Sequence, residues 1–234
     1  MKESISVRQI CFILLAYSAA TKLLLYPAHA AAAAGNALIF SALFNLALQT
    51  GIIWSVAYMS SRTQLSFFEM LQNTFGKVTA RIIYALFALY FVMSAVIPMN
   101  EQQLLVHDSF YDTMPSLVIF MPFFIFSVYA GVKSFKNVGR CADICLPVFL
   151  ITVTGFLIMS VGEADFTNLA PVLKQPFGKV AGVSLASVFR FSESAFLLMF
   201  AGHYKYKKGD AAKLTLSYVA GGLFVIAIMA AVYS

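Results

Sequence analysis

The sequence predicts an all-α polytopic membrane protein, and its composition and hydropathy pattern support this fold class. Of the 234 residues, 61% are hydrophobic and 11% are charged, and the mean hydropathy is +0.83. A soluble domain carries roughly 25% charged residues. Apolar runs of about 20 residues recur along the chain, and a run of this length crosses a bilayer as a helix. The runs are continuously apolar instead of alternating, which disfavours a transmembrane β-barrel.

Seven candidate spans follow from these runs, within a single transmembrane domain of residues 1–234. Their approximate ranges are 8–33, 36–60, 78–104, 114–131, 137–160, 182–203 and 211–233. The first run is long enough to span, so we expect an uncleaved helix and not a signal peptide. Residues 62–81 have apolar side chains near helical spacing. This pattern predicts a short interfacial helix, with an ordered loop as the alternative.

The basic residues predict a cytoplasmic N-terminus. With that orientation, 12 of the 16 lysines and arginines fall in cytoplasmic segments. They are Lys2, Arg8, Arg62, Lys77, Arg81, Lys133, Lys136, Arg140, Lys205, Lys207, Lys208 and Lys213. The external segments contain only Lys174 and Lys179, as the positive-inside rule requires. The net charge of +6 therefore reflects loops beside a lipid bilayer and does not indicate a nucleic-acid partner.

Three charged residues lie inside the predicted spans. Lys22 falls in the first span, and Arg190 and Glu193 fall in the sixth. An isolated charge at the bilayer centre costs about 3 kcal/mol on insertion scales. Glu193 would reduce this cost by pairing with Lys22 across helices or with Arg190 along its own helix. The alternatives are a purely structural ion pair, or side chains that extend to the membrane surface.

Small and polar residues accompany these charges and indicate where the helices are interrupted. Together they argue for an interior site that is water-accessible or ion-paired. Its residues are Ala20, Thr21, Lys22, Ser187, Arg190 and Glu193, and the family resemblance described below implies that they bind a ligand. Asn45 and Gln49 in the second span are expected to make interhelical hydrogen bonds. Asp143 is expected to pair with Arg140, three residues earlier on the same helix.

Motifs of soluble enzymes and cofactor sites are missing from the sequence. It contains no Gly-rich phosphate loop, no HExxH and no nucleophile elbow. The three cysteines, Cys11, Cys141 and Cys145, do not have the ligand number or spacing of a metal site. We therefore expect no enzyme activity, no cofactor and no metal, and we expect the cysteines to be small buried side chains.

The opening stretch ESISVRQICFILLAYSAATKLLLYP resembles the start of the spore germination permeases, the GerAB-type B subunits of germinant receptors. Ile5, Ser6 and Gln9 match the Ile-Ser-x-x-Gln element of that family, and Pro27 matches the proline that ends its first helix.

Three later segments extend the resemblance, in order, to most of the chain. Residues 129–151 are similar to the family's Gly…Ala-Arg-x-x-Glu…Pro pattern. The matching residues are Gly131, Arg140, Asp143 in place of the glutamate, and Pro147. The segment ADFTNLAPVL, residues 164–173, resembles the acidic-x-x-Asn-Leu-x-Pro external segment. Glu193 matches the acid of the Phe-x-Glu element in the sixth helix.

This family belongs to the amino acid–polyamine–organocation transporter superfamily, and the resemblance therefore implies a fold. That fold is a five-plus-five inverted repeat of the LeuT type, with discontinuous helices 1 and 6 around a midplane ligand. Residues 1–160 would form the first repeat and residues 161–234 an incomplete second one. Family members usually have ten spans, so a seven-span chain is expected to be truncated. Ala20-Thr21-Lys22 stands at a Gly-x-Gly-like element, where Lys22 either contacts an anionic ligand or fills the site as a built-in cation.

The resemblance implies a subunit of a germination receptor in the spore inner membrane. It would sense a small nutrient such as an amino acid, together with a second membrane subunit and a lipoprotein. Two alternatives use the same residues. One is a proton-coupled amino acid permease in which Glu193 carries the proton, and the other is an inactive truncated remnant whose charges only hold helices together.

Overall fold

The computed structural model describes residues 5–22, 26–63, 65–110, 115–133, 135–160, 162, 176–190, 193–204 and 206–233. The elements within these ranges are all helices. They are α1 Val7–Lys22, α2 Tyr26–Ala34, the 3₁₀ helix η1 Gly35–Ala37, α3 Leu38–Thr63, α4 Phe67–Phe75, α5 Lys77–Phe110, α6 Ser116–Val132, α7 Phe135–Ser160, α8 Phe177–Arg190, α9 Glu193–Leu198 and α10 Asp210–Tyr233.

The predicted spans correspond to these helices. Five described helical segments are long and apolar enough to cross a membrane: Ala30–Thr63, Lys77–Val96, Lys136–Met159, Phe177–Leu198 and Asp210–Ala231. Two shorter apolar helices, Val7–Ala19 and Phe120–Val132, correspond to the first and fourth predicted spans. The all-α polytopic membrane fold is therefore confirmed. The predicted first span comprises α1 and α2, and the sixth comprises α8 and α9.

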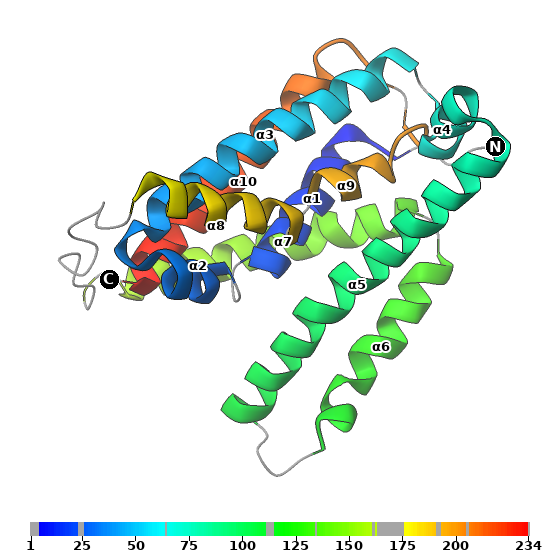
Figure 1. The fold of residues 1–234 in the computed structure, drawn as a ribbon. Coiled ribbons are helices and arrows are strands. Elements are labelled where there is room, and N and C mark those ends of the chain that lie inside the picture. The colour runs from blue at the N-terminus through cyan, green and yellow to red at the C-terminus, as the bar shows by residue number, and fades with distance from the viewer. Residues whose placement is uncertain are drawn as a thin grey trace.

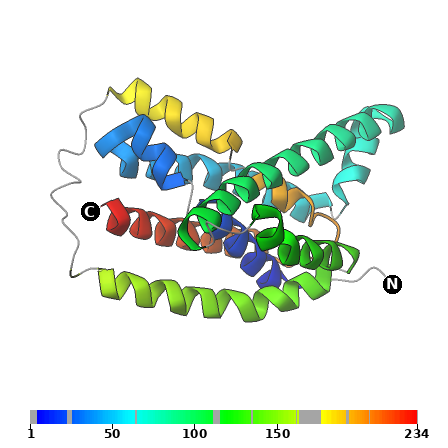
Figure 2. The ribbon, with the colours of Figure 1, turned by 90° about the horizontal axis from the view of Figure 1, so that it is seen from below.

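Most of the helices form a bundle around α1. Helix α3 packs against α2, α8, α9 and α10, while α1 packs against α7, α9 and α10. Figure 1 shows α1 and α9 near the centre, whereas α5 and α6 lean away from the other helices. In Figure 2, α7 lies along one flank beside α10. Helices α1 and α9 consequently meet in the interior of the bundle.

Close packing of α10 depends on two glycines. A Cβ on Gly221 would overlap the side chain of Leu15 on α1, and a Cβ on Gly222 would overlap Leu46 on α3. Small residues allow membrane helices to approach closely, and van der Waals contact then replaces the hydrophobic driving force that is missing in lipid. This packing buries Tyr218, one turn before Gly221, at 1% exposure.

The segment between α3 and α5 contains the short helix predicted there. The Ser66 hydroxyl accepts a hydrogen bond from the Glu69 N–H, and the Glu69 carboxylate accepts one from the Ser66 N–H. This capping box satisfies two amide groups at the start of α4. Gly76 ends the helix with a φ of 80°, a conformation that glycine adopts without strain.

The cysteines differ from expectation on α7. Cys11 is buried, but Cys141 and Cys145 are exposed, with their sulfur atoms 3.7 Å apart. Ile144 and Ile151 on the same helix are more than two-thirds exposed. The expectation for α7 was wrong because an apolar side chain on a membrane helix can face lipid instead of a protein core.

Candidate functional site

The candidate residues lie at the ends of described helices. Helix α1 is described as far as Lys22 and α2 from Tyr26, while α8 is described as far as Arg190 and α9 from Glu193. The second residue of α2 is Pro27, whose missing N–H is tolerated in the first turn of a helix and disfavoured in its interior. Lys22 and Glu193 are thus the last and first described residues of α1 and α9, and their side chains meet.

Lys22 and Glu193 form a buried ion pair. The Lys22 Nζ lies 2.8 Å from the Glu193 Oε1, and the side chains are 7% and 0% exposed. The two charges neutralise each other in an environment where either charge alone would be costly. The sequence left open whether Glu193 pairs with Lys22 or with Arg190, and the structure contains the pair with Lys22.

Tyr218 and Gln49 extend this pair into a network that joins four helices. The Lys22 ammonium donates a hydrogen bond to the Tyr218 hydroxyl over 3.1 Å, and this hydroxyl donates to the Gln49 Oε1 over 2.8 Å. The same hydroxyl oxygen is 3.5 Å from the Glu193 Oε2. The network thus connects α1, α3, α9 and α10 through side chains that are all buried.

A second polar contact joins α3 and α8. The Asn45 amide donates to the Ser184 carbonyl over 3.1 Å, and the hydroxyls of Ser41 and Ser184 are 3.0 Å apart. Ser187 is also buried on α8, where its hydroxyl donates to the Val183 carbonyl over 2.8 Å. These contacts fix α8 against α3 beside the ion pair.

A small void lies beside Lys22. It has a volume of about 10 Å³ and is bordered by Lys22, Tyr26, Asn45 and Gly222, among others. A single water molecule needs a void of roughly 10–15 Å³ on this measure. The described residues on this side of Lys22 are therefore packed closely.

A larger cavity lies on the other side of the α1 terminus. It has a volume of about 400 Å³ and lies between α1, α5 and α6. Half of the ten lining residues are polar, and none of them carries a charged side chain. The lining residues are Tyr17, Thr21, Ser94, Ala95, Met99, Gln102, Val106, Phe120, Phe123 and Ser127. We call this space the polar cavity.

An aromatic cluster adjoins Tyr17, which lines the polar cavity. Tyr17 stacks on Phe196 of α9, with ring centroids 4.5 Å apart. Phe91 of α5 meets Phe196 edge to face, with centroids 6.3 Å apart. Offset or edge-to-face aromatic contacts of this kind are favourable. They connect α5, which leans outward, to the interrupted helices.

The structure brings together three of the six predicted site residues. Lys22 and Glu193 form the ion pair, and Thr21 lines the polar cavity next to Lys22. Ser187 lies one helical turn from Ser184 and bonds to its own helix. The side chains of Ala20 and Arg190 lie outside the part of the chain that the structure describes.

The residues that match the first family motif form a separate contact at the start of α1. The Ser6 hydroxyl accepts from the Gln9 N–H, and the Gln9 amide donates to the Asp143 Oδ2 over 3.0 Å. The Arg8 guanidinium is 3.3 Å from the same carboxylate. The expected pairing of Asp143 with Arg140 was wrong, because α1 packs against α7 and brings Arg8 and Gln9 to Asp143.

Sequence reasoning missed Tyr218 as a functional candidate. It is a polar side chain in the middle of the apolar seventh span, and a buried tyrosine hydroxyl usually has a hydrogen-bond partner. Gln49 was expected to bond between helices, and the structure places it in the Tyr218 network. Among the described residues, no group of three or more histidine, cysteine, aspartate and glutamate side chains has the arrangement of a metal site.

Comparison with known proteins identifies the family. A family model described as "Spore germination protein" matches residues 4–234, which is nearly the whole chain. No curated protein and no solved structure matched the chain in parallel comparisons. The family match covers α1, with its Ser6 and Gln9 cap, and both interrupted helices. The chain therefore belongs to the spore germination permease family and is an integral membrane permease or receptor subunit of spore germination.

Proposed function

We propose that the protein is the nutrient-sensing membrane subunit of a germination receptor and that it binds an amino acid beside the interruption of α1. The observation that carries this proposal is the position of the polar cavity. Its wall includes Thr21, and the next residue, Lys22, forms the buried pair with Glu193. A ligand in the cavity would therefore act directly on the residue preceding the ion pair.

Oxygen atoms in the wall of the polar cavity can accept hydrogen bonds from the ammonium group of a small zwitterion. The Thr21 and Ser94 hydroxyls donate to the Tyr17 and Phe91 carbonyls of their own helices and keep oxygen lone pairs for a ligand. We propose that α1 ends beside this cavity, where the partial negative charge of its C-terminus would complement the ammonium group of the ligand. Transporters with interrupted helices hold their substrates at such ends. Lys22 remains paired in this proposal and serves as the built-in cation.

The ion pair would report ligand binding to the rest of the bundle. Lys22, Glu193, Tyr218 and Gln49 belong to four different helices, so a shift of the α1 terminus changes contacts in all of them. A ligand shifts a conformational equilibrium only if it binds one packing better than the other. We propose that the altered packing is passed to other receptor subunits, a membrane subunit and a lipoprotein.

Thermal unfolding of the purified protein with a panel of amino acids tests this proposal. A ligand that binds only the folded state at 100 times its Kd adds about 2.7 kcal/mol of stability. We expect one or more amino acids to raise the melting temperature, and we expect Thr21→Val to reduce that rise. The matched control is Thr152→Val on α7, where the hydroxyl bonds to the Val148 carbonyl of its own helix and is exposed.

Two results would contradict the proposal. One is a melting temperature that no amino acid changes. The other is an equal ligand response in Thr21→Val and Thr152→Val. Germination assays with the same variants then distinguish binding from signalling, because a sensing subunit with Thr21→Val requires a higher nutrient concentration.

The second candidate function is a proton-coupled amino acid permease, and the position of Glu193 favours it. This carboxylate is fully buried, in contact with Lys22 and close to the Tyr218 hydroxyl, where it could exchange a proton during a transport cycle. Uptake of labelled amino acid into proteoliposomes would be stimulated by a pH gradient and lost in Glu193→Gln. Uptake at background level, with and without the gradient, would eliminate this candidate.

A further inference from the structure

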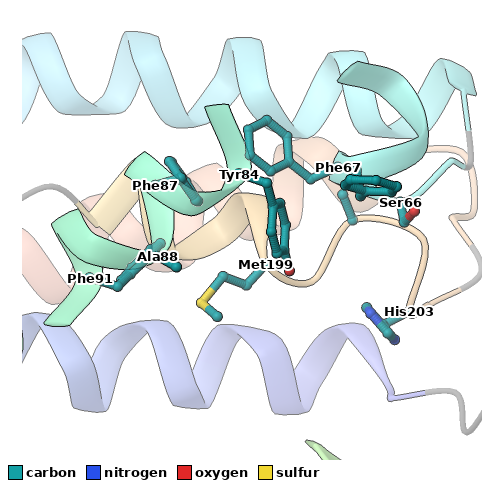
Figure 3. A pocket seen from close by; sticks show the side chains of 10 residues that line it. Ser66, Phe67, Tyr84, Phe87, Ala88, Phe91, Met199 and His203 are labelled. Atoms are coloured by element: carbon teal, nitrogen blue, oxygen red, sulfur yellow. The ribbon is translucent and has the colours of Figure 1, made fainter. Parts of the chain in front are cut away.

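A second cavity lies between α4, α5 and the segment that follows α9. It has a volume of about 440 Å³, and Figure 3 shows its aromatic wall. Eight of its ten lining residues are apolar or aromatic. The lining residues are Ser66, Phe67, Phe68, Tyr84, Phe87, Ala88, Phe91, Met199, Ala201 and His203. We call this space the aromatic cavity. Its composition suits a hydrocarbon ligand much better than a polar nutrient.

One face of α5 carries both a cation and part of the cavity wall. Arg81, Tyr84, Ala88 and Phe91 follow each other at intervals of three, four and three residues, so they share this face. The lining residues of α5 run from Tyr84 to Phe91, which is about 10 Å of helix at 1.5 Å per residue. With Arg81 included, the face is about 15 Å long, which is half the thickness of the hydrocarbon core of a bilayer.

Two cations extend this face of α5 beyond the cavity. Arg81 lies one turn before Tyr84, and Lys77 lies one turn before Arg81; both cations are exposed. The apolar span of α5 begins at Lys77, which places these cations where hydrocarbon gives way to headgroups. The amphipathic helix α4, whose Phe67 and Phe68 line the cavity, lies at the same level. The two cations therefore lie beyond the surface end of the cavity, at the level of the aromatic side chains of α4.

We propose that the aromatic cavity binds an anionic phospholipid, with one acyl chain between α4, α5 and the α9 segment and its phosphate beside Lys77 and Arg81. The acyl chain matches the aromatic wall, and the anionic headgroup matches the two exposed cations, which an apolar transmembrane helix would not neutralise. This site is separate from the polar cavity, so it does not depend on the proposed nutrient binding.

Tryptophan quenching by brominated lipids tests the acyl-chain position in the full chain. The only tryptophan, Trp54, is replaced by phenylalanine, and a new one is placed by Phe87→Trp in the cavity wall. Vesicles contain phosphatidylglycerol or phosphatidylcholine with identical brominated chains. We expect phosphatidylglycerol to quench this tryptophan preferentially. Arg81→Gln should lower the relative affinity for phosphatidylglycerol about fivefold, as expected for one basic residue at an anionic headgroup.

Two controls distinguish a bound lipid from bulk bilayer. Leu89→Trp places the probe two residues along α5, away from the cavity face, where the side chain is 54% exposed. It should be quenched equally by both lipids. Arg140→Gln removes an exposed cation of α7 at the same end of the bundle and should leave the preference at position 87 unchanged.

Equal lipid preference at positions 87 and 89 would overturn the proposal, as would equal effects of Arg81→Gln and Arg140→Gln. If Phe87→Trp does not fold, native mass spectrometry supplies the same comparison without a probe. Delipidated wild-type protein should retain phosphatidylglycerol over phosphatidylcholine, and Arg81→Gln should lose this selectivity. The proposal would also be refuted if the protein retained neither lipid, or if it retained another protein chain in place of a lipid.

Discussion

The two ends of α1 each carry an ion pair, and the two pairs differ in environment. Lys22 and Glu193 are 2.8 Å apart, with side-chain exposures of 7% and 0%. Arg8 and Asp143 are 3.3 Å apart, with exposures of 71% and 21%. The two ion pairs are therefore expected to contribute differently to the free energy of unfolding. A buried charge that loses its partner cannot return to water, whereas an exposed one can.

The largest expected effect is the loss of one buried partner. Glu193→Gln should lower the free energy of unfolding by about 3–5 kcal/mol, because it leaves the Lys22 ammonium buried without a counter-charge. Denaturant unfolding in mixed micelles measures this loss. Asp143→Asn is the matched substitution at the exposed end and should cost much less. Equal losses of unfolding free energy in the two variants would show that burial does not make the Lys22–Glu193 pair more important for stability than the Arg8–Asp143 pair.

Removing both buried charges sharpens the comparison. Lys22→Met combined with Glu193→Gln should be less destabilising than the sum of the single substitutions, with a coupling energy of about 2–3 kcal/mol. The measurement is a double-mutant cycle of unfolding free energies. The same cycle on Arg8 and Asp143 should give a coupling below about 1 kcal/mol. Additive effects at the buried end would mean that the pair has no energetic role.

Loss of the Tyr218 hydroxyl, which bonds to Lys22, should have an intermediate effect on the free energy of unfolding. Tyr218→Phe removes the acceptor for Lys22 and the donor for Gln49, which should cost about 1–3 kcal/mol. Tyr204→Phe is the control, because the buried Tyr204 hydroxyl has no hydrogen-bond partner among the described residues. Because this substitution removes an unpaired buried hydroxyl and loses no hydrogen bond, it should leave the free energy of unfolding unchanged or raise it. Unfolding midpoints that do not distinguish these two variants would argue against the network.

The smallest effect is expected at the exposed end. Arg8→Ala should lower the free energy of unfolding by less than about 1 kcal/mol, and the difference from wild type should shrink as salt is added. Unfolding at low and high ionic strength measures both quantities. Gln9→Ala serves as the companion variant, because its amide bonds to the same carboxylate from a partly buried position. A salt-independent loss as large as that of Glu193→Gln would contradict this ranking.

Local pattern was sufficient for much of the fold. Hydropathy located the spans because each helix must satisfy its backbone inside the membrane and present apolar side chains to lipid. The helix α4 followed from amphipathic spacing, and Lys22 and Glu193 were notable because charges inside a span are rare and costly. These inferences need only the residue and its immediate neighbours.

Contacts between distant segments were harder to predict. Asp143 was assigned to its neighbour Arg140, although its partner Arg8 lies 135 positions away. Tyr218 received no role because a single tyrosine in an apolar span does not reveal which helix it faces. Cys141 and Cys145 were expected in a core, but the helix that carries them has its outer face open.

The sequence by itself determined the fold class and the positions of the spans, and it singled out a lysine and a glutamate within two of them. Bilayer thickness and the cost of an intramembrane charge act on short segments, so these features are readable in the order of residues. Only the tertiary structure decided that Lys22 contacts Glu193 and Tyr218. It also decided that Thr21 lines the polar cavity, whereas Lys22 and Glu193 do not. Helix packing sets those distances, because it depends on how glycines and small side chains of separate helices fit against one another.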